Sequence, residues 1–400
     1  METSKAFLEV PFHRAAMGDE EVEAVAAVIR SGWLTMGPKT VEFEHAFAEY
    51  VGAGHAIAVS SGTAALHLAL EAAGLSPADE VLLPAITFTA TAEAVIYLGA
   101  RPVLVDVDPN TMNFDVRDAM RRITSRTRAI IPVHFGGQPC DMDEVHRFAQ
   151  RHGLRIVEDA AHALPAEYKG KKIGALSEFT AFSFYTTKTL ATGEGGMITT
   201  DNEPAAARMR MMRLHGIGRD AWKRYQNDGS WHYEVLEAGF KYNFTDLQAA
   251  IGRVQLRKCD ELRAARLHIA LSYLEAFKTL DELVLPVELP DRKTSWHLFV
   301  LRLQLKKLKI DRSEFIRQLK KRGICTSVHF IPLHLHPFYQ RKYGYSRGDF
   351  PVAESEYESC LSLPIYPMMS EREVTAVITA VSEIASQARP VTVAVTGAQL

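Results

Sequence analysis

The sequence predicts an α/β fold in which a mainly parallel sheet is followed by a smaller α+β domain. Two observations lead to this prediction. Between about residue 56 and residue 200, short apolar or β-branched runs alternate with helical segments, as in a parallel sheet whose strands are joined by helices. After residue 200 the alternation ends, and a polar stretch and a long helical stretch precede the next strands.

Seven runs of the first part are predicted as strands. Most are apolar throughout rather than alternating, as expected when helices cover both faces of a sheet. They span residues 56–60, 80–85, 101–107, 128–135, 155–160, 179–184 and 196–200. Helices are predicted over 19–30, 63–73 and 142–152, each with a glycine at or near its end.

The second part predicts a long helix over 245–280. Strands are then predicted at 297–303 and 325–330, and helices at 312–321 and 371–385. Before them, residues 219–234 read as a long polar and aromatic loop, a candidate binding or gating element. We therefore expect a large domain over 1–255, a small domain over 256–388, and a flexible tail over 389–400.

Composition excludes several classes of protein. The chain has 46 lysines and arginines against 48 aspartates and glutamates, a formal net charge of −2, so no nucleic-acid partner is expected. No uncharged apolar run reaches the roughly 18 residues of a membrane span, and no signal peptide is recognisable, so we expect a soluble, cytoplasmic protein. The four cysteines lie far apart without a CxxC pair, which argues against a zinc cluster and a disulfide framework.

The turn after the first predicted strand is a candidate phosphate site. It reads Ser60-Ser61-Gly62-Thr63-Ala64-Ala65 and opens a helix, so its small residues and free N–H groups suit an anion. An ordinary Ser/Thr helix cap has the same appearance. Familiar alternatives such as GxxxxGK[ST], HExxH, GxSxG and an opening GxGxxG are absent from the sequence.

Two further features lie at strand ends. Asp159 ends the fifth predicted strand, where ligands of open α/β sheets bind, and Lys188 follows the sixth strand in a loop that continues to Gly193, Gly195 and Gly196. Alone, the carboxylate reads as a cap or an ion-pair partner and the lysine as a solvated surface residue. With the phosphate turn they match the needs of pyridoxal phosphate, which requires an amine, a partner for its pyridine nitrogen and a phosphate cup. Phe88 is placed either to stack on the pyridine ring or to join the core.

Six sequence blocks, taken in order, resemble the DegT/DnrJ/EryC1/StrS sugar aminotransferases. The blocks are SSGTAALHLAL, PAITFTATAEAV, EDAAHA, FSFYTTKTLATGEGG, RLHGIGRD and KYNFTDLQAAIGRVQL. The similarity runs from about residue 11 to about residue 384. It implies the aspartate aminotransferase fold (fold type I) and pyridoxal 5′-phosphate as cofactor.

The resemblance also implies roles for individual residues. Lys188 is the Schiff-base lysine, Asp159 the partner of the pyridine nitrogen, and Phe88 the stacking ring. His162 falls beside the phenolic oxygen of the cofactor. The phosphate cup comprises Gly62, Thr63, Ala64 and Ser183, together with Asn243 from the neighbouring subunit of a homodimer; the alternative for Asn243 is a turn residue before the next helix.

The implied reaction is amination of a keto group, at C4, of a nucleotide-linked deoxysugar with glutamate as donor. Many relatives have Asn-Tyr-Arg where this chain has Asn243-Phe244-Thr245, a variant closer to enzymes acting on UDP-linked 4-ketosugars. Alternatives are a dehydratase or lyase on the same cofactor and a non-catalytic regulatory protein; Lys188, replaced by histidine in related dehydratases, favours transamination.

Weaker candidates complete the sequence predictions. Trp33, His215 and Arg219 are candidate substrate contacts. The histidines of SVHFIPLHLHPF suggest a metal by composition alone, but the resemblance implies none, and turn or subunit contacts are the simpler interpretation.

Overall fold

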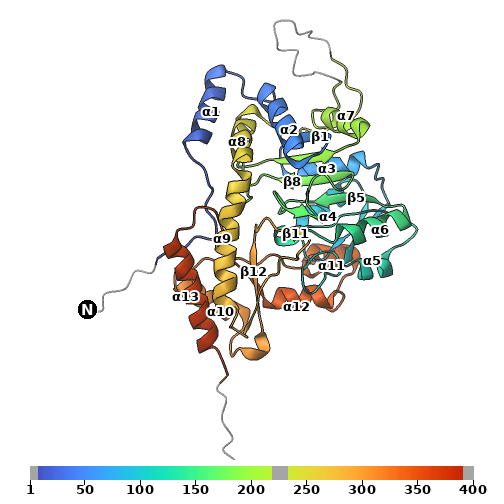
Figure 1. The fold of residues 1–400 in the computed structure, drawn as a ribbon. Helices are drawn as coiled ribbons and strands as arrows, with labels where there is room; N and C mark the ends of the chain where they lie inside the picture. The colour runs from blue at the N-terminus through green and yellow to red at the C-terminus, as the bar shows by residue number, and fades with distance from the viewer. Residues whose placement is uncertain (1–7, 219–232, 391–400) are drawn as a thin grey trace, which may run out of the picture.

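A seven-stranded sheet forms the centre of the computed structural model, which describes residues 8–218 and 233–390 (Figure 1). The strand order is β1-β9-β8-β5-β4-β2-β3. The strands are β1 (His55–Val59), β2 (Glu80–Pro84), β3 (Arg101–Val105), β4 (Thr127–Ile130), β5 (Arg155–Asp159), β8 (Phe179–Ser183) and β9 (Gly196–Thr200). All seven predicted strands are present. The sheet is parallel except for β9, which runs antiparallel to β1 and β8.

Helices cover both faces of this sheet. One face carries α3 (Gly62–Ala72), α4 (Thr89–Tyr97) and α7 (Glu203–Met212); the other carries α2 (Pro38–Val51), α5 (Val116–Arg122), α6 (Met142–His152) and α8 (Asp246–Arg257). Successive strand side chains point to opposite faces. In β1, Ile57 packs in the core under α3, α4 and α7, and Ala58 packs in the core under α2, α5, α6 and α8. Because both faces are buried, the strands are apolar throughout.

A smaller layer follows in the chain. The sheet β10-β12-β13, formed by Leu283–Val284, Phe299–Leu303 and Cys360–Leu363, packs with α9 (Cys259–Phe277), α10 (Arg312–Lys321) and α13 (Glu371–Gln387) around a third core. Val10 joins this core from the N-terminal segment. Two short helices, α11 (Pro337–Tyr343) and α12 (Pro351–Ser359), contribute to the core of the first sheet. The domain limits at residues 255 and 388 stay predictions.

Three short strands form a third sheet, in the order β11-β6-β7. They are β6 (Glu167–Tyr168), β7 (Lys171–Lys172) and β11 (Arg292–Lys293). This sheet joins the two parts of the chain, since β11 pairs with β6. No helix within the described ranges is long and apolar enough to cross a membrane.

Two sequence predictions are wrong. The helix expected over 245–280 is divided at Lys258 into α8 and α9. The two halves pack on different partners, α8 on α1 (Asp19–Ser31) and α2, and α9 on α13. The strand expected over 325–330 is also absent: Cys325 bonds to Val10 and Ser327 to Ser362, so neither partner forms consecutive pairs.

The other predicted elements of the second part are confirmed. Helix α10 has the predicted limits, α13 extends two residues beyond its predicted end at residue 385, and β12 lies within 297–303. The predicted loop at 219–234 lies almost entirely outside the described residues, and so does the tail from residue 391.

Candidate active site

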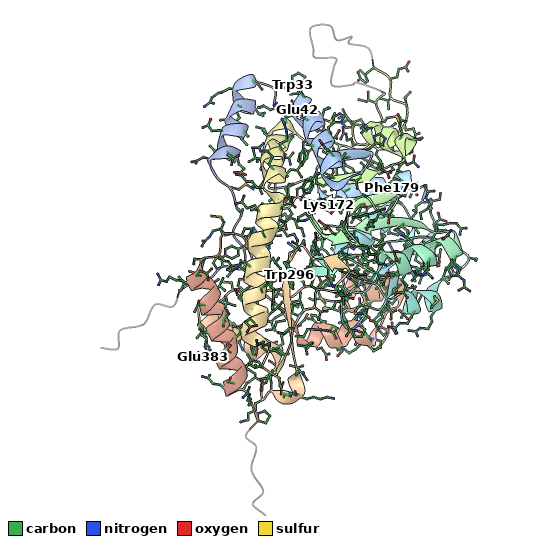
Figure 2. All side chains as sticks on the ribbon, viewed as in Figure 1. Trp33, Glu42, Lys172, Phe179, Trp296 and Glu383 are labelled. Atoms are coloured by element: carbon green, nitrogen blue, oxygen red, sulfur yellow. The ribbon has the colours of Figure 1, made fainter. Side chains whose placement is uncertain are left out.

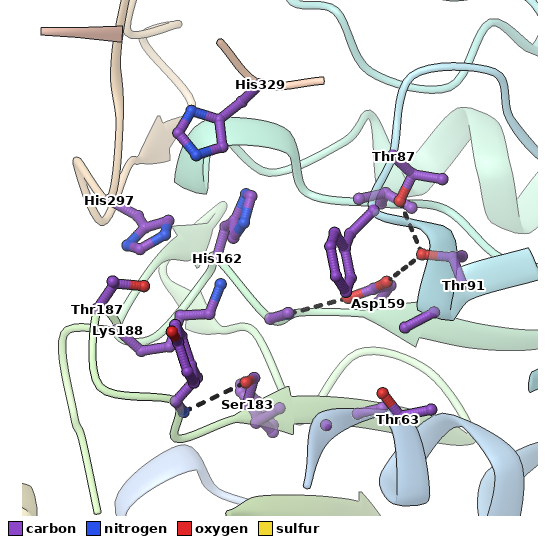
Figure 3. Close-up of a pocket in the computed structure, with 18 of the residues that line it drawn as sticks. Thr63, Thr87, Thr91, Asp159, His162, Ser183, Thr187, Lys188, His297 and His329 are labelled. Carbon is purple, nitrogen blue, oxygen red and sulfur yellow. Dashed lines mark hydrogen bonds between the residues drawn. The ribbon is translucent and has the colours of Figure 1, made fainter. Parts of the chain in front are cut away.

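A pocket of about 520 Å³ opens at the carboxyl ends of β1, β2, β5 and β8 (Figure 3). Parallel strands deliver their carboxyl ends to one edge, so residues far apart in sequence meet there. The pocket is lined by seven of the predicted site residues, namely Gly62, Thr63, Phe88, Asp159, His162, Ser183 and Lys188.

The start of α3 forms the anion-binding side of the pocket. A side chain at Gly62 would bring its Cβ to 2.9 Å from the Ser183 Cβ, so only glycine allows the helix to begin this close to the end of β8. Ser61 caps the helix by accepting from the Ala64 N–H at 3.1 Å. The N–H groups of Gly62 and Thr63 donate to no acceptor in the described part of the chain. Ala64 itself is not in the lining.

Asp159 is held in place by two hydrogen bonds. Its Oδ2 accepts from the Thr91 hydroxyl at 2.8 Å and its Oδ1 from the Ala161 N–H at 3.1 Å. Thr91 is fixed in turn by Thr87, 2.7 Å away. Burial raises the pKa of Asp159, an effect opposed by these bonds and by Lys188. The carboxylate is thus aimed before any ligand binds, and a ligand carrying a proton or positive charge would relieve its desolvation.

Lys188 extends into the pocket toward His162 (Figure 3). Burial lowers its pKa to about 8, since Asp159 only partly offsets desolvation and the nearby cation Arg266 opposes a second charge. Within the described residues its ammonium forms neither an ion pair nor a hydrogen bond. A buried amine with a lowered pKa and no partner among these residues has the chemistry of a nucleophile.

His162 presents a neutral imidazole. Its Nδ1 accepts from the Gly136 N–H at 3.3 Å, so the ring proton is assigned to Nε2. Burial, Lys188 and His329 together hold the pKa of His162 well below its usual value. A neutral ring with a proton on Nε2 can donate to a ligand oxygen.

Residues from other parts of the chain close the pocket and were missed as site residues. They include His13, Thr91, Tyr185, Thr187, His297, Phe330 and Ile365, and His329 was noted only for its composition. His297 lies 4.4 Å from His162 between ring centroids, and its buried Nδ1 has no partner in the described part of the chain. No three His, Cys, Asp or Glu side chains within 8–218 and 233–390 are arranged to hold a metal ion.

Three more of the predicted residues, Asn243, Trp33 and His215, lie outside the pocket lining. Asn243 is outside the lining, and its backbone pairs with Val59 in β1. Trp33 borders a separate hollow between α1, α2 and α8, at the end of the molecule where Glu42 lies (Figure 2). His215 is exposed and outside the pocket, and Arg219 lies outside the described residues.

Comparison with known proteins gives consistent matches. Residues 15–382 match the model of the DegT/DnrJ/EryC1/StrS aminotransferase family. The spore coat polysaccharide biosynthesis protein SpsC of Bacillus subtilis is 49% identical over 376 residues, covering 94% of this chain and 97% of SpsC.

Solved structures agree with this fold. DesV of S. venezuelae, in complex with a ketimine intermediate, has a TM-score of 0.85 and 38% identity, with 92% of this chain and 94% of that chain covered. The PLP form of Spr1654 from Streptococcus pneumoniae has a TM-score of 0.89 and 30% identity, with 96% and 100% covered. The similarity therefore includes both parts of the chain.

Proposed function

Because the chain belongs to the DegT/DnrJ/EryC1/StrS aminotransferase family, we propose that it is a pyridoxal-phosphate-dependent sugar aminotransferase. The observation that carries this proposal is the meeting of a free lysine amine, a fixed buried carboxylate and an open helix N-terminus in one pocket. More finely, we propose that it aminates C4 of a nucleotide-linked ketosugar with glutamate as donor.

The residues of the pocket fit pyridoxal phosphate. The free N–H groups of Gly62 and Thr63 and the hydroxyl of Ser183 would hold the phosphate. Phe88, exposed at 59% and lining the pocket, offers a ring face for stacking. The Nε2–H of His162 would donate to the phenolic oxygen. When bound, the cofactor supplies an aldehyde for amines and a ring that delocalises electrons.

Asp159 and Lys188 would act on the reacting atoms. Asp159 would keep a proton on the pyridine nitrogen, because its two oxygens are already oriented by Thr91 and Ala161. Lys188 would move a proton between the substrate carbon and the cofactor. With a pKa of about 8, about a tenth of the free amine is unprotonated at pH 7, far more than for an ordinary lysine.

We further propose a homodimer in which Asn243 reaches the phosphate of the neighbouring subunit. The position of Asn243 outside its own pocket supports this arrangement. Mixing Lys188→Ala with Asn243→Ala subunits would test it, because each mixed dimer keeps one intact site. Recovered activity supports the shared site, and no recovery despite confirmed subunit exchange contradicts it. A cytoplasmic location stays a prediction.

The enzymatic alternative is a dehydratase or lyase on the same cofactor, and the other alternative is a non-catalytic regulator. One experiment separates all three. The protein is mixed with 15N-glutamate and a panel of 3-keto and 4-keto UDP- and dTDP-sugars, and the products are measured by mass spectrometry. An aminotransferase forms 2-oxoglutarate and a 15N-labelled amino sugar, a lyase forms an unlabelled sugar product, and a regulator forms neither.

A further inference from the structure

Arg266 lies behind the pocket, on α9, with 1% of its surface exposed. Its guanidinium donates to three backbone carbonyl oxygens: that of Ile365 at 2.6 Å, that of His297 at 3.3 Å and that of Thr187 at 3.4 Å. All three acceptor residues line the pocket. One buried side chain therefore ties together the Lys188 loop, the segment before β12 and the segment after β13.

The charge of Arg266 has no counter-ion among the described residues. It forms no ion pair with a carboxylate there, and its Nε is buried without a partner. Burial lowers its pKa to about 10, so the guanidinium is still charged at neutral pH. Burying an unpaired charge is unfavourable, and apolar residues of similar size usually serve stability as well or better. Packing alone is therefore a weak reason for an arginine here.

We propose that Arg266 is a positioning residue for Lys188. The Arg266 side chain holds the Thr187 carbonyl, next to Lys188, against the segments of His297 and Ile365. Its uncompensated positive charge also disfavours a positive charge on Lys188. This inference rests on the function proposed for Lys188. It goes beyond that function because Arg266 does not line the pocket and would act only through other residues.

The surroundings of both groups support the electrostatic part. Among the described residues, Asp159 is the acid and Arg266 the cation that shift the pKa of Lys188, and a second acid, Glu194, also lines the pocket. The histidines and the cysteine that interact electrostatically with either side chain are neutral at pH 7: burial lowers the pKa of His13, His162, His297 and His329 and raises that of Cys259. Arg266 is thus the principal positive charge acting on the lysine.

The test compares Arg266→Met, which removes the charge at similar length, with Arg266→Lys, which keeps the charge but cannot span three carbonyls. Arg292→Met is the matched control. Arg292 is also buried and donates to a carbonyl, that of Pro139 at 2.9 Å, but it pairs with Asp291, and Pro139 is not part of the pocket lining. Circular dichroism establishes that each variant is folded.

The first readout is the pKa of Lys188 in the cofactor-free protein. It is obtained from the pH dependence of acetylation by limiting acetic anhydride, followed on the Lys188 peptide by mass spectrometry. We expect Arg266→Met to raise this pKa by about one unit, a tenfold shift in proton affinity, and Arg292→Met to leave it unchanged. An unchanged pKa in folded Arg266→Met overturns the inference.

The second readout is kinetic. Arg266→Lys keeps the positive charge, so the pKa of Lys188 should stay near that of the wild type. We expect kcat to fall about tenfold with little change in KM, because Lys188 is displaced when the loop that carries it is held less firmly. If Arg266→Met does not fold, this variant decides, and a kcat within about twofold of wild type overturns the positioning role. If the cofactor attaches to another lysine in the wild-type protein, the function proposed for Lys188 is wrong. The acetylation comparison would still show whether Arg266 lowers the pKa of Lys188.

Discussion

The two walls of the pocket differ in how the carboxylate of one and the buried ring nitrogens of the other are hydrogen-bonded. On the sheet side, both oxygens of Asp159 accept hydrogen bonds, and Ser61 caps the helix that opens at Gly62. On the opposite side, buried ring nitrogens of His13 and His297 have no partner among the described residues.

From this difference we infer different tasks for the two walls. Groups that are already oriented suit a ligand that stays in one place, as a cofactor does. A buried ring nitrogen without a hydrogen-bond partner lowers stability unless a ligand supplies that hydrogen bond. Such nitrogens therefore suit substrates, which enter and leave the pocket. We therefore expect changes on the sheet side to affect the chemistry, and changes on the histidine side to affect substrate binding.

Lys188→Ala is expected to have the largest effect. It removes the amine that attaches the cofactor and moves the proton, so transamination should fall by about three orders of magnitude or more. Steady-state assays with 15N-glutamate measure the loss. Lys169→Ala is the control, because Lys169 is half-exposed and pairs with Asp143. A Lys188→Ala rate within about tenfold of wild type contradicts the assignment.

Asp159→Asn is expected to come next. An amide keeps the shape of the carboxylate but cannot hold the pyridine nitrogen protonated, so both half-reactions should slow by about 100-fold or more. Stopped-flow measurement of each half-reaction, with cofactor content determined separately, tests this. Near-normal cofactor content with slow half-reactions supports the account; unchanged rates remove Asp159 from it.

His297→Phe tests the opposite wall. The ring is replaced by one of similar shape without nitrogen atoms, so cofactor content should be retained. The KM for the donor or for the sugar should rise about tenfold, corresponding to one lost hydrogen bond to a charged ligand. His268→Phe, on the exposed side of α9, is the control. If His297→Phe lost cofactor while both KM values stayed unchanged, the histidine side would serve the cofactor and not the substrate, which contradicts this account.

The smallest effect concerns stability and pH. The pKa of Lys188 is about 8 in the folded protein and near 10.5 when unfolded, so the unfolded chain binds the extra proton between these values. The cofactor-free wild type should therefore be less stable than Lys188→Met at pH 7, and the difference should shrink as pH rises toward 10. Thermal unfolding of both proteins across this pH range measures the difference in stability. A difference that does not change with pH would contradict the lowered pKa of Lys188.

The two walls also differ in how far the sequence predicts them. Asp159, Ser183 and Gly62 lie at or just beyond strand ends, and the strands were recognisable because buried parallel strands are apolar throughout. The parallel arrangement then brings their ends to one edge. This explains why the sheet-side residues were predicted as a group.

The histidine wall depends on packing between distant segments. His297 precedes β12, and His329 lies in a segment whose hydrogen bonds are divided between Val10 and Ser362. No periodicity in the sequence indicates that the segments of His297 and His329 pack side by side. The division at Lys258 was missed for the same reason, since it reflects which partners α8 and α9 pack against.

The central claim is that Lys188 is the cofactor-attachment lysine of this pocket. Its most direct test is to incubate the protein with pyridoxal phosphate, reduce with borohydride, digest, and locate the modified lysine by mass spectrometry. The account predicts one stable adduct on Lys188, abolished in Lys188→Ala. An adduct on Lys169, Lys171 or Lys172 in its place, or modification that persists at the same level in Lys188→Ala, would contradict it.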